Sequence, residues 1–220
     1  MKVKIEEALK SVYPDIRLGC LWYEADVEEE NEDLWNYMHE QVLPEITKQI
    51  EVEGLTNIEG IRSSRAAYKA FGRNPGRYRV SSESLLRRVR QGHELYHVNS
   101  IVDVNNLVSV QTACSLGSYD LKHIQGDICL SVGKANEGYE GIGKDFIDME
   151  NMLLLKDDLG PFGSPTSDSH RAMIGLDSKQ MVTILYCFSS EIDLQSEMEK
   201  AKDYFIQYAH VQNVQIEIVK

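Results

Sequence analysis

The sequence predicts one α+β domain, a single mixed domain that spans residues 1–220. Two kinds of segment follow one another along the chain, as in mixed folds. Some place apolar residues at helical spacing, and others are short apolar runs typical of β-strands. The composition, with 42% hydrophobic and 26% charged residues, is that of an ordinary globular protein. No repeat, low-complexity segment or linker divides the chain, and this length is enough to bury one large core.

The first third of the chain predicts one strand followed by two helices. After a short opening helix or turn, residues 16–27 are apolar and aromatic and follow Pro14, which indicates a strand. Residues 28–54 place apolar side chains at helical spacing behind leading acids, and Pro44 interrupts or kinks that helix. Residues 58–71 indicate the second helix.

A turn and two further helices are predicted in the middle of the chain. Gly and Pro at 72–77 break regular structure and indicate the turn. Ser81 and Ser82 provide a serine cap for a helix that runs to Arg90. Residues 98–116 are the most apolar of this part and indicate a buried helix. Its cap and first turn are expected at Asp103, Asn105 and Asn106.

The chain after residue 118 is predicted to be mostly β, with one helix near its end. The β-like segments are residues 127–132, 144–158 and 180–188. Residues 193–209 have the apolar spacing of an amphipathic helix, and residues 214–220 form a closing strand.

Charge and cysteine content restrict the class of protein. A net charge of −12 does not favour non-specific binding of nucleic acid by the chain as a whole. No apolar run approaches the roughly 18 residues that a membrane span needs, and the start of the chain has no apolar signal segment. The cysteines are widely spaced and form no C-x-x-C motif. We therefore expect a cytoplasmic protein with reduced thiols and no contact with a membrane.

Motifs for nucleotide or metal binding are weak. Residues 138–145 place Gly138, Gly143 and Lys144 at the spacing of a phosphate-binding loop. Asp145 stands where that motif needs Ser or Thr, so we interpret the segment as a β-turn. Among the six histidines, only His93 and His97 stand four residues apart, at the spacing of a metal-binding helix, but the residues between them lead into a predicted strand, so we do not interpret the pair as a metal site. We expect no metal and no cofactor.

Residues 164–173 gather Ser, Thr, Asp, His and Arg in one loop. Neighbours such as Ser169 and His170 point apart in an extended chain, so the loop is not a self-contained nucleophilic triad. Two interpretations remain open: a polar loop that caps a helix or turn, and the rim of a pocket. In the second, Asp168 and Arg171 bind the charged ends of an amino-acid-like ligand.

A basic segment contrasts with the acidic remainder of the chain. Residues 61–90 hold eight Arg, one Lys and one acid, Glu83, which gives this segment a charge of +8. The rest of the chain therefore carries a charge of −20. The planar guanidinium group binds phosphate through two hydrogen bonds, and such contacts position a nucleic acid without reading its sequence. The alternative is internal pairing with some of the 35 acids. The arginines that we expect to contact phosphate are Arg73, Arg77, Arg79, Arg87 and Arg88.

Three stretches of the sequence resemble a known family. “NPGRYRVSSESLLRRV”, “VNSIVDVNNLVSV” and “GSYDLKHIQGDI” resemble the B3/B4 domain of the bacterial phenylalanyl-tRNA synthetase β-subunit, and more closely the free-standing B3/B4 proteins that lack a synthetase core. The resemblance is specific over residues 72–130 and extends over 60–190. In the synthetase, this domain hydrolyses tyrosine wrongly attached to the phenylalanine tRNA. The resemblance implies an α+β editing fold, a pocket for an aminoacyl group and a basic surface for the tRNA acceptor end.

The resemblance also places the editing positions on this chain. The editing histidine of the synthetase falls on Gly117, and its editing glutamate falls near Ser164 or Pro165, so both side chains are replaced. An aminoacyl ester is already activated, so a positioned water and oxyanion donors suffice for hydrolysis. Backbone N–H groups of residues 160–164 are the expected donors. The helix start of the synthetase motif is matched by Val102, Asp103, Asn105 and Asn106.

From these positions we predict two groups of site residues. Asn99 and Asn106 are expected to orient the attacking water or the terminal ribose. A carboxylate is expected to bind the α-ammonium group of the substrate at close range. The predicted catalytic residues are Asn99, Asn106 and Asp168. The predicted substrate-binding residues are Asp103, Asp120, Gly117, Ser164, Ser169 and Arg171.

Three functional hypotheses follow. The first is a free-standing deacylase that hydrolyses a mischarged aminoacyl-tRNA in trans and so supports translation fidelity, with the tRNA acceptor end and its aminoacyl group as partners, and neither DNA nor a membrane. The second is a non-catalytic protein of the same fold that binds a free amino acid, a small metabolite or tRNA. The third is an unrelated Ser/His hydrolase built on residues 164–173.

Overall fold

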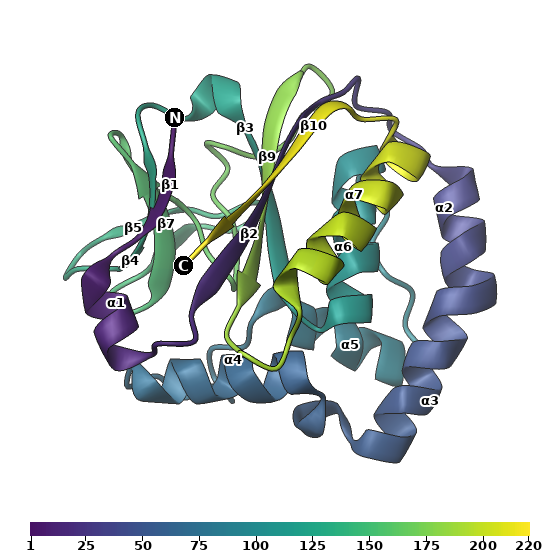
Figure 1. Ribbon diagram of the computed structural model, residues 1–220, viewed down its shortest axis with the longest axis horizontal. Helices are drawn as coiled ribbons and strands as arrows, with labels where there is room; N and C mark the ends of the chain where they lie inside the picture. Colours follow the sequence, from purple (N-terminus) through teal and green to yellow (C-terminus); the bar gives the residue numbers. More distant parts are fainter.

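A four-stranded antiparallel sheet with the strand order β10-β2-β9-β3 forms the centre of the structure. The computed structural model describes residues 1–220. Figure 1 shows this sheet running through the middle of the molecule. Its strands are β2 (Arg17–Glu24), β3 (Ser115–Asp120), β9 (Gln180–Cys187) and β10 (Gln212–Val219).

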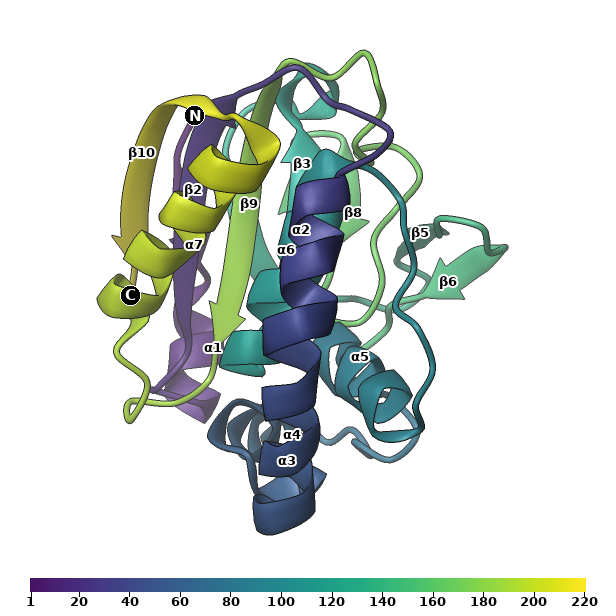
Figure 2. The same cartoon turned by 90° about the vertical axis from the view of Figure 1, so that its right-hand side faces the viewer.

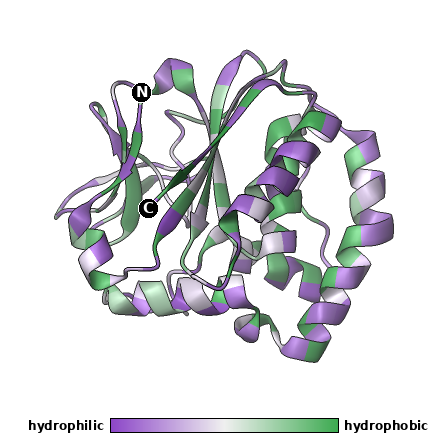
Figure 3. Ribbon diagram, in the orientation of Figure 1, coloured by the Kyte–Doolittle hydropathy of each residue, from purple (hydrophilic) through white to green (hydrophobic).

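Helices cover one face of this sheet, as Figures 1 and 2 show. The helices in contact with the sheet include α6 (Ser100–Thr112) and α7 (Leu194–Ala209). The layer is completed by α2 (Glu32–Tyr37), α3 (Leu43–Glu53) and α5 (Ser81–Arg90). Figure 3 shows apolar and polar residues alternating along the outer helices, which turn their apolar sides toward the core, whereas α6 is buried on nearly all sides. No helix combines the length and the apolar character that crossing a membrane requires.

A second sheet covers the opposite face of the first. Its strand order is β1-β4-β7-β8, and only β1 and β4 pair in parallel. Its strands are β1 (Val3–Ile5), β4 (Ile128–Val132), β7 (Leu153–Asp157) and β8 (Gly160–Gly163). On this side of the molecule lies α1 (Glu7–Val12), whereas α4 (Glu59–Ala70) runs beneath both layers, with Ile61 in the core beneath the helices and Tyr68 in the core beneath the second sheet. A hairpin of β5 (Gly138–Glu140) and β6 (Phe146–Asp148) projects from the body in Figure 2.

Strand β9 separates two apolar cores. Met181, Leu185 and Cys187 belong to the core beneath the helices, whereas Ile184 and Tyr186 belong to the core beneath the second sheet. All five are buried. Since successive side chains of a strand point to opposite faces, neighbouring residues of this sheet enter different interiors. The same alternation governs β3, which carries the candidate site.

Most of the predicted elements are confirmed. Helices at 58–71 and 193–209 correspond to α4 and α7, and the strand at 16–27 corresponds to β2. The β segments at 127–132, 180–188 and 214–220 correspond to β4, β9 and β10. The segment at 144–158 contains two strands, β6 and β7, instead of one. The short strands β1, β5 and β8 were not predicted, because three or four residues carry too little periodicity.

The kinked helix predicted over residues 28–54 is confirmed, and its irregularity has a local cause. A π-helical segment, Met38–Val42, joins α2 to α3, and Pro44 lies in the first turn of α3. Proline has no N–H to donate, and its ring crowds the carbonyl four residues earlier. The wider π turn before Pro44 accommodates both effects.

The predicted cap of α6 is wrong by four residues. Asn99 caps this helix, and its Oδ1 accepts the Val102 N–H at 3.0 Å. Asp103 lies within the first turn and binds elsewhere. The predicted helix is also too long, because Ala113 adopts a left-handed conformation with φ of 56° that ends α6. Residues 115 and 116, expected in the helix, belong instead to strand β3, which runs to Asp120.

The serine cap predicted for α5 is also wrong. The N-cap residue is Val80, which makes no side-chain cap hydrogen bond. Tertiary contacts satisfy the first N–H groups instead. The Ser81 N–H donates to the Pro165 carbonyl at 2.7 Å, and the Ser82 N–H donates to Ser115 Oγ at 3.1 Å. The start of α5 is therefore attached to the loop after β8 and to β3.

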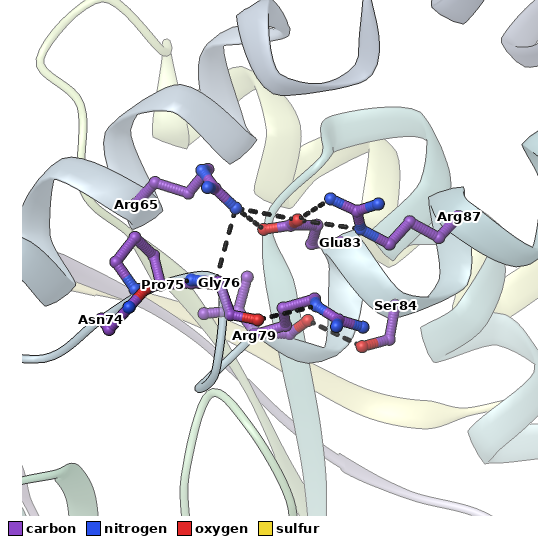
Figure 4. Close-up of polar contacts among 9 residues, drawn as sticks. Arg65, Asn74, Pro75, Gly76, Arg79, Glu83, Ser84 and Arg87 are labelled. Atoms are coloured by element: carbon purple, nitrogen blue, oxygen red, sulfur yellow. Dashed lines mark hydrogen bonds and ion pairs between the residues drawn. The ribbon is translucent and has the colours of Figure 1, made fainter.

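A buried carboxylate joins α4 to α5. Glu83 on α5 is only 1% exposed, and Arg65 on α4 binds both of its oxygens at 3.0 Å. Arg87, one turn later on α5, donates to Glu83 Oε1 through Nε at 3.0 Å and Nη2 at 2.8 Å. Figure 4 shows both guanidinium groups pointing at this carboxylate from opposite sides. Internal pairing therefore accounts for Arg65 and Arg87.

Replacing Glu83 with Gln is expected to lower the free energy of unfolding by about 2–3 kcal/mol, because two half-buried guanidinium groups lose their counter-charge. Urea denaturation measures this change. A matched control is Glu191→Gln, whose carboxylate makes an exposed pair with Arg62 and should contribute little. Equal stability of the two variants would contradict a structural role for Glu83.

Candidate functional site

Strand β3 places two residues of the candidate site beneath the second sheet. Gly117 and Tyr119 lie on that face, and the Tyr119 ring packs edge-on against Phe162 of β8. Tyr119 Oη donates to Asp168 Oδ1 at 2.8 Å and lies 3.0 Å from Tyr186 Oη on β9. A Cβ atom on residue 117 would collide with the Tyr119 hydroxyl and stand 3.2 Å from Asp168 Oδ2. The absence of a side chain at Gly117 thus makes room for the contact between Tyr119 and Asp168.

The loop after β8 holds Asp168 through bonds within the loop itself. Ser164 Oγ donates to the Ser167 carbonyl at 2.7 Å and accepts the N–H groups of Thr166 and Ser167. The Ser164 N–H donates to Asp168 Oδ1 at 3.2 Å, and the Tyr139 hydroxyl donates to the Ser167 carbonyl. The N–H groups of Ser164, Thr166 and Ser167 are therefore occupied, and Ser164 is not a free oxyanion donor.

Burial sets the ionisation of Asp168. Its pKa rises to about 6, chiefly because burial penalises the charged carboxylate, while the hydrogen bonds from Tyr119 and Ser164 lower the pKa in part. Both of those bonds end on Oδ1, and Oδ2 accepts none. Asp168 therefore offers one free oxygen, beside Gly117, on a carboxyl group that titrates close to neutral pH. The neighbouring Ser169 hydroxyl is buried and also has no partner.

A second polar cluster lies on the helix side of the sheet, and sequence reasoning missed it. Asn105 on α6 exchanges hydrogen bonds with Ser118 Oγ at 2.8 and 3.0 Å. Ser118 Oγ also bonds Thr183 Oγ1, which lies 2.8 Å from the Tyr23 hydroxyl. These groups satisfy one another inside the core, so the cluster ties α6 to three strands. Polar residues at alternate positions of otherwise apolar strands are the sequence signal for it.

Asn99 and Asp103 serve the fold at the start of α6. Asp103 is 1% exposed and accepts the Trp35 Nε1–H at 2.8 Å and the Val98 N–H at 2.9 Å. Burial raises the pKa of this carboxyl group. Asn106, one turn later, is half-buried and makes no side-chain hydrogen bond. The sheet separates these residues from Asp168, so the structure does not bring the predicted catalytic residues into one cluster.

Asp120 and Arg171 are also held by internal contacts. Asp120 accepts the Lys122 N–H at 2.9 Å and the Ser178 hydroxyl at 2.7 Å. Arg171 makes a two-bond ion pair with Asp157 at 2.9 and 3.0 Å, and donates to the His123 and Gly160 carbonyls. The two residues lie in different places: Asp120 lines a cavity of about 710 Å³ at the end of the first sheet, and Arg171 lies against β7 and β8. That cavity is lined by Glu24, Ala25, Asp26, Glu28, Asp120, Leu121, Lys122, Asp177, Lys179, Gln180, His210 and Gln212.

The arginines of residues 73–90 divide into paired and unpaired groups. Arg87 is paired with Glu83, whereas the others have no carboxylate within 4.0 Å. These unpaired residues are Arg73, Arg77, Arg79, Arg88 and Arg90. Figure 4 shows Arg79 turned toward the carbonyl of its own turn, at Gly76, instead of toward an acid. We call these five residues the basic surface.

The basic surface adjoins the loop that holds Asp168. The Pro165 carbonyl accepts the first N–H of α5, from Ser81. The Tyr68 hydroxyl of α4 lies 3.0 Å from Thr166 Oγ1. Both helices that flank the arginine-rich turn are thus bonded to residues 165–166. Nowhere in the structure do three or more His, Cys, Asp or Glu side chains come together in a way that could hold a metal ion.

Residues 63–219 match the model of one protein family, described as the B3/4 domain. The match covers well over half of the chain. The chain belongs to the B3/4 domain family. The solved N-terminal fragment of the phenylalanyl-tRNA synthetase beta-subunit from Pyrococcus horikoshii is similar over 99% of this chain and 50% of that fragment, with 14% identity and a TM-score of 0.46. The chain thus spans half the length of that fragment. No protein of curated function matches it.

In this B3/4 domain the predicted site residues separate into three places. Gly117, Ser164 and Asp168 come together beneath the second sheet, together with Tyr119 and Tyr186, which the predicted site had not included. Ser169 lies next to Asp168, and the remaining predicted residues lie at the start of α6 or at the ends of the sheets. A tyrosine in a buried strand needs a partner for its hydroxyl group, and this requirement is the signal that could have identified Tyr119 and Tyr186.

The raised pKa of Asp168 predicts a pH-dependent stability. The folded pKa of about 6 lies above the ordinary 3.8, so the protonated carboxyl stabilises the fold below pH 3.8 and this contribution is lost as pH rises through about 6. Relative to Asp168→Asn, the wild-type protein should lose about 1–3 kcal/mol over this window. Melting temperatures measured against pH test this, with Asp145→Asn as an exposed control. Parallel curves for wild type and Asp168→Asn would contradict the burial of this carboxyl.

Proposed function

We propose that this B3/4 domain protein hydrolyses the ester bond of a mischarged aminoacyl-tRNA in trans. The observation that carries the proposal is the free Oδ2 of Asp168, a buried carboxyl with a pKa of about 6, beside Gly117. A general base works best when its pKa is near the working pH, because it is then both ionised and able to accept a proton. The proposal takes residues 1–220 as one editing domain that acts in the cytoplasm, where tRNA is charged.

The proposed reaction needs only water and the chain's own groups. Asp168 Oδ2 accepts a proton from a water molecule, and the resulting hydroxide adds to the ester carbonyl carbon. The bond from that carbon to the ribose oxygen then breaks, and the proton passes from Asp168 to the ribose oxygen. Tyr119 and the Ser164 N–H hold Oδ1 and so fix the orientation of Oδ2. Holding the reacting groups in place is itself a large part of the rate increase.

The basic surface supports the choice of a tRNA substrate. The Ser81–Pro165 and Tyr68–Thr166 bonds connect α4 and α5 to the loop that carries Asp168. Unpaired arginines on α5 and on the turn between the two helices can meet phosphate groups while the ester lies at Asp168. This local charge acts on a ligand independently of the overall net charge of −12.

One observation favours a second candidate function, that of a non-catalytic protein which binds a free amino acid, a small metabolite or tRNA. The Tyr119 hydroxyl occupies the space that a side chain at residue 117 would need, so no second catalytic group faces Asp168 there. Saturable binding without turnover would support this alternative. A deacylation rate that falls when Asp168 is replaced would exclude it.

Deacylation of a panel of misacylated tRNAs tests the proposal directly. At least one tRNA should lose its ester faster with the protein than in buffer, and Asp168→Asn should lower the rate about 100-fold or more. Asp145→Asn, an exposed carboxylate on the hairpin, should keep the wild-type rate. Because Asp168 must be ionised to act, the rate should rise with pH through about 6 and then level off. If every tRNA in the panel lost its ester no faster than in buffer alone, the proposal would be wrong.

Binding of tRNA tests the basic surface. The double variant Arg77→Glu with Arg79→Glu should bind tRNA more weakly, and its log-log salt dependence should flatten by roughly one unit for each lost phosphate contact. Lys200→Glu with Lys202→Glu on α7 is a matched change of charge at a different helix. If both double variants lose affinity equally, net charge and not the basic surface governs binding.

A further inference from the structure

An exposed aromatic ring stands beside the basic surface in a fixed position. Tyr96 is 61% exposed, and the Arg88 guanidinium lies 4.1 Å from the centroid of its ring. Arg88 Nη1 also donates to the Tyr96 hydroxyl at 2.9 Å. Its Nε and Nη2 donate to the Glu94 carbonyl at 3.0 and 2.7 Å. Every nitrogen of Arg88 is thus used to hold Tyr96 and its segment.

The residues on either side of Tyr96 are anchored as well. Leu95 is buried in the core beneath the helices, with 3% exposure. The His97 ring stacks on Trp35, with centroids 3.7 Å apart and planes 8° apart, and Trp35 is bonded to the buried Asp103. Tyr96 therefore presents its ring to solvent from a segment that is fixed before and after it. A ring held in this way loses little entropy when a flat partner stacks on it.

A similar arrangement occurs at the other end of α5. The guanidinium groups of Arg73 and Arg77 lie 5.1 and 5.5 Å from the centroid of the Tyr78 ring. Since α5 has 10 residues, its ends are about 15 Å apart. Arg90 at its end is exposed and has no carboxylate partner. Aromatic rings with unpaired arginines beside them are the elements with which proteins bind single-stranded nucleic acid.

We propose that Tyr96 is a stacking platform for a base of single-stranded RNA, with Arg90, at the same end of α5, as a phosphate contact. The inference rests on the proposed function, because it identifies the part of the tRNA that this surface contacts, its unpaired strand. The open face of Tyr96 accepts any base, since every base has a flat π surface. Bases within a duplex are stacked on one another and cannot use it.

Binding of a short, fluorescein-labelled single-stranded RNA of mixed sequence, followed by anisotropy, tests the inference. Tyr96→Ala should weaken binding about tenfold, and its salt dependence should match that of the wild type, because stacking releases no counterions. Tyr96→Phe keeps the ring and should bind nearly as well as the wild type. Arg90→Gln should instead reduce the log-log salt slope by about one unit. The same strand in a duplex should bind with no dependence on Tyr96.

Two results would overturn the inference: equal affinity of the wild type and Tyr96→Ala for the single strand, or an equal loss for the single strand and the duplex. The inference would also be overturned if polyglutamate displaced the RNA as efficiently as unlabelled RNA does, since charge alone would then explain binding. Tyr96→Leu keeps an apolar side chain without a π face, and it should behave like Tyr96→Ala. This second variant, with a melting temperature measured for each protein, separates lost stacking from lost folding.

The same proteins separate this inference from the proposed deacylase activity. Hydrolysis of an aminoacyl-adenosine, which carries the ester but no RNA strand, should depend on Asp168 and not on Tyr96. Tyr96-dependent RNA binding with no ester hydrolysed by the wild type would leave the stacking surface intact and remove the proposed function. Hydrolysis that depends on Asp168, together with RNA binding that does not change when Tyr96 is replaced, would support the proposed function and remove the stacking surface.

Discussion

The burial of strands β2, β9 and β3 of the first sheet on both faces is the constraint on which the rest of the structure depends. Helices cover one face and the second sheet covers the other. Along β9, Met181 through Cys187 are all buried, so each of these side chains belongs to one core or the other. Burial of apolar surface on both faces contributes about 25 cal/mol per Å². The register between β2 and β9 is therefore fixed, because a slip by one residue would exchange the contents of the two cores.

This constraint decides where polar side chains of the sheet find partners. Ser118 turns toward the helices and joins Asn105 and Thr183, whereas Tyr119 turns the other way and bonds Asp168. A buried polar group without a partner costs free energy, so each face of the sheet carries its own closed set of hydrogen bonds. On the side of the second sheet, Asp168 Oδ2 beside Gly117 and the Ser169 hydroxyl remain without a partner.

The arginine-rich segment shows how an acidic protein maintains a basic surface. Its only acid, Glu83, is buried between Arg65 and Arg87 and so locks α4 to α5. Arg79 and Arg88 bond to backbone carbonyls, and Arg73, Arg77 and Arg88 lie over tyrosine rings. These contacts hold the guanidinium groups without cancelling their charge. The segment therefore combines a structural ion pair with a set of oriented, uncompensated cations.

The sequence by itself determined the α+β class, the B3/4 family, most of the helices and the longer strands, because periodicity and motifs are local properties of the chain. Through the resemblance it also indicated Gly117 and Ser164 or Pro165 as the editing positions, and the polar loop at 164–173 indicated Asp168 as a candidate. Only the tertiary structure decided that Asn99 and Asp103 stabilise the start of α6, and that Arg171 belongs to an ion pair with Asp157. Only the tertiary structure showed that Arg87 pairs with Glu83, that Tyr119 bonds Asp168 and that Tyr186 bonds Tyr119. The physical reason is that hydrogen bonds and burial depend on strand alternation and on distant partners, such as residues 119 and 168, which no local pattern connects.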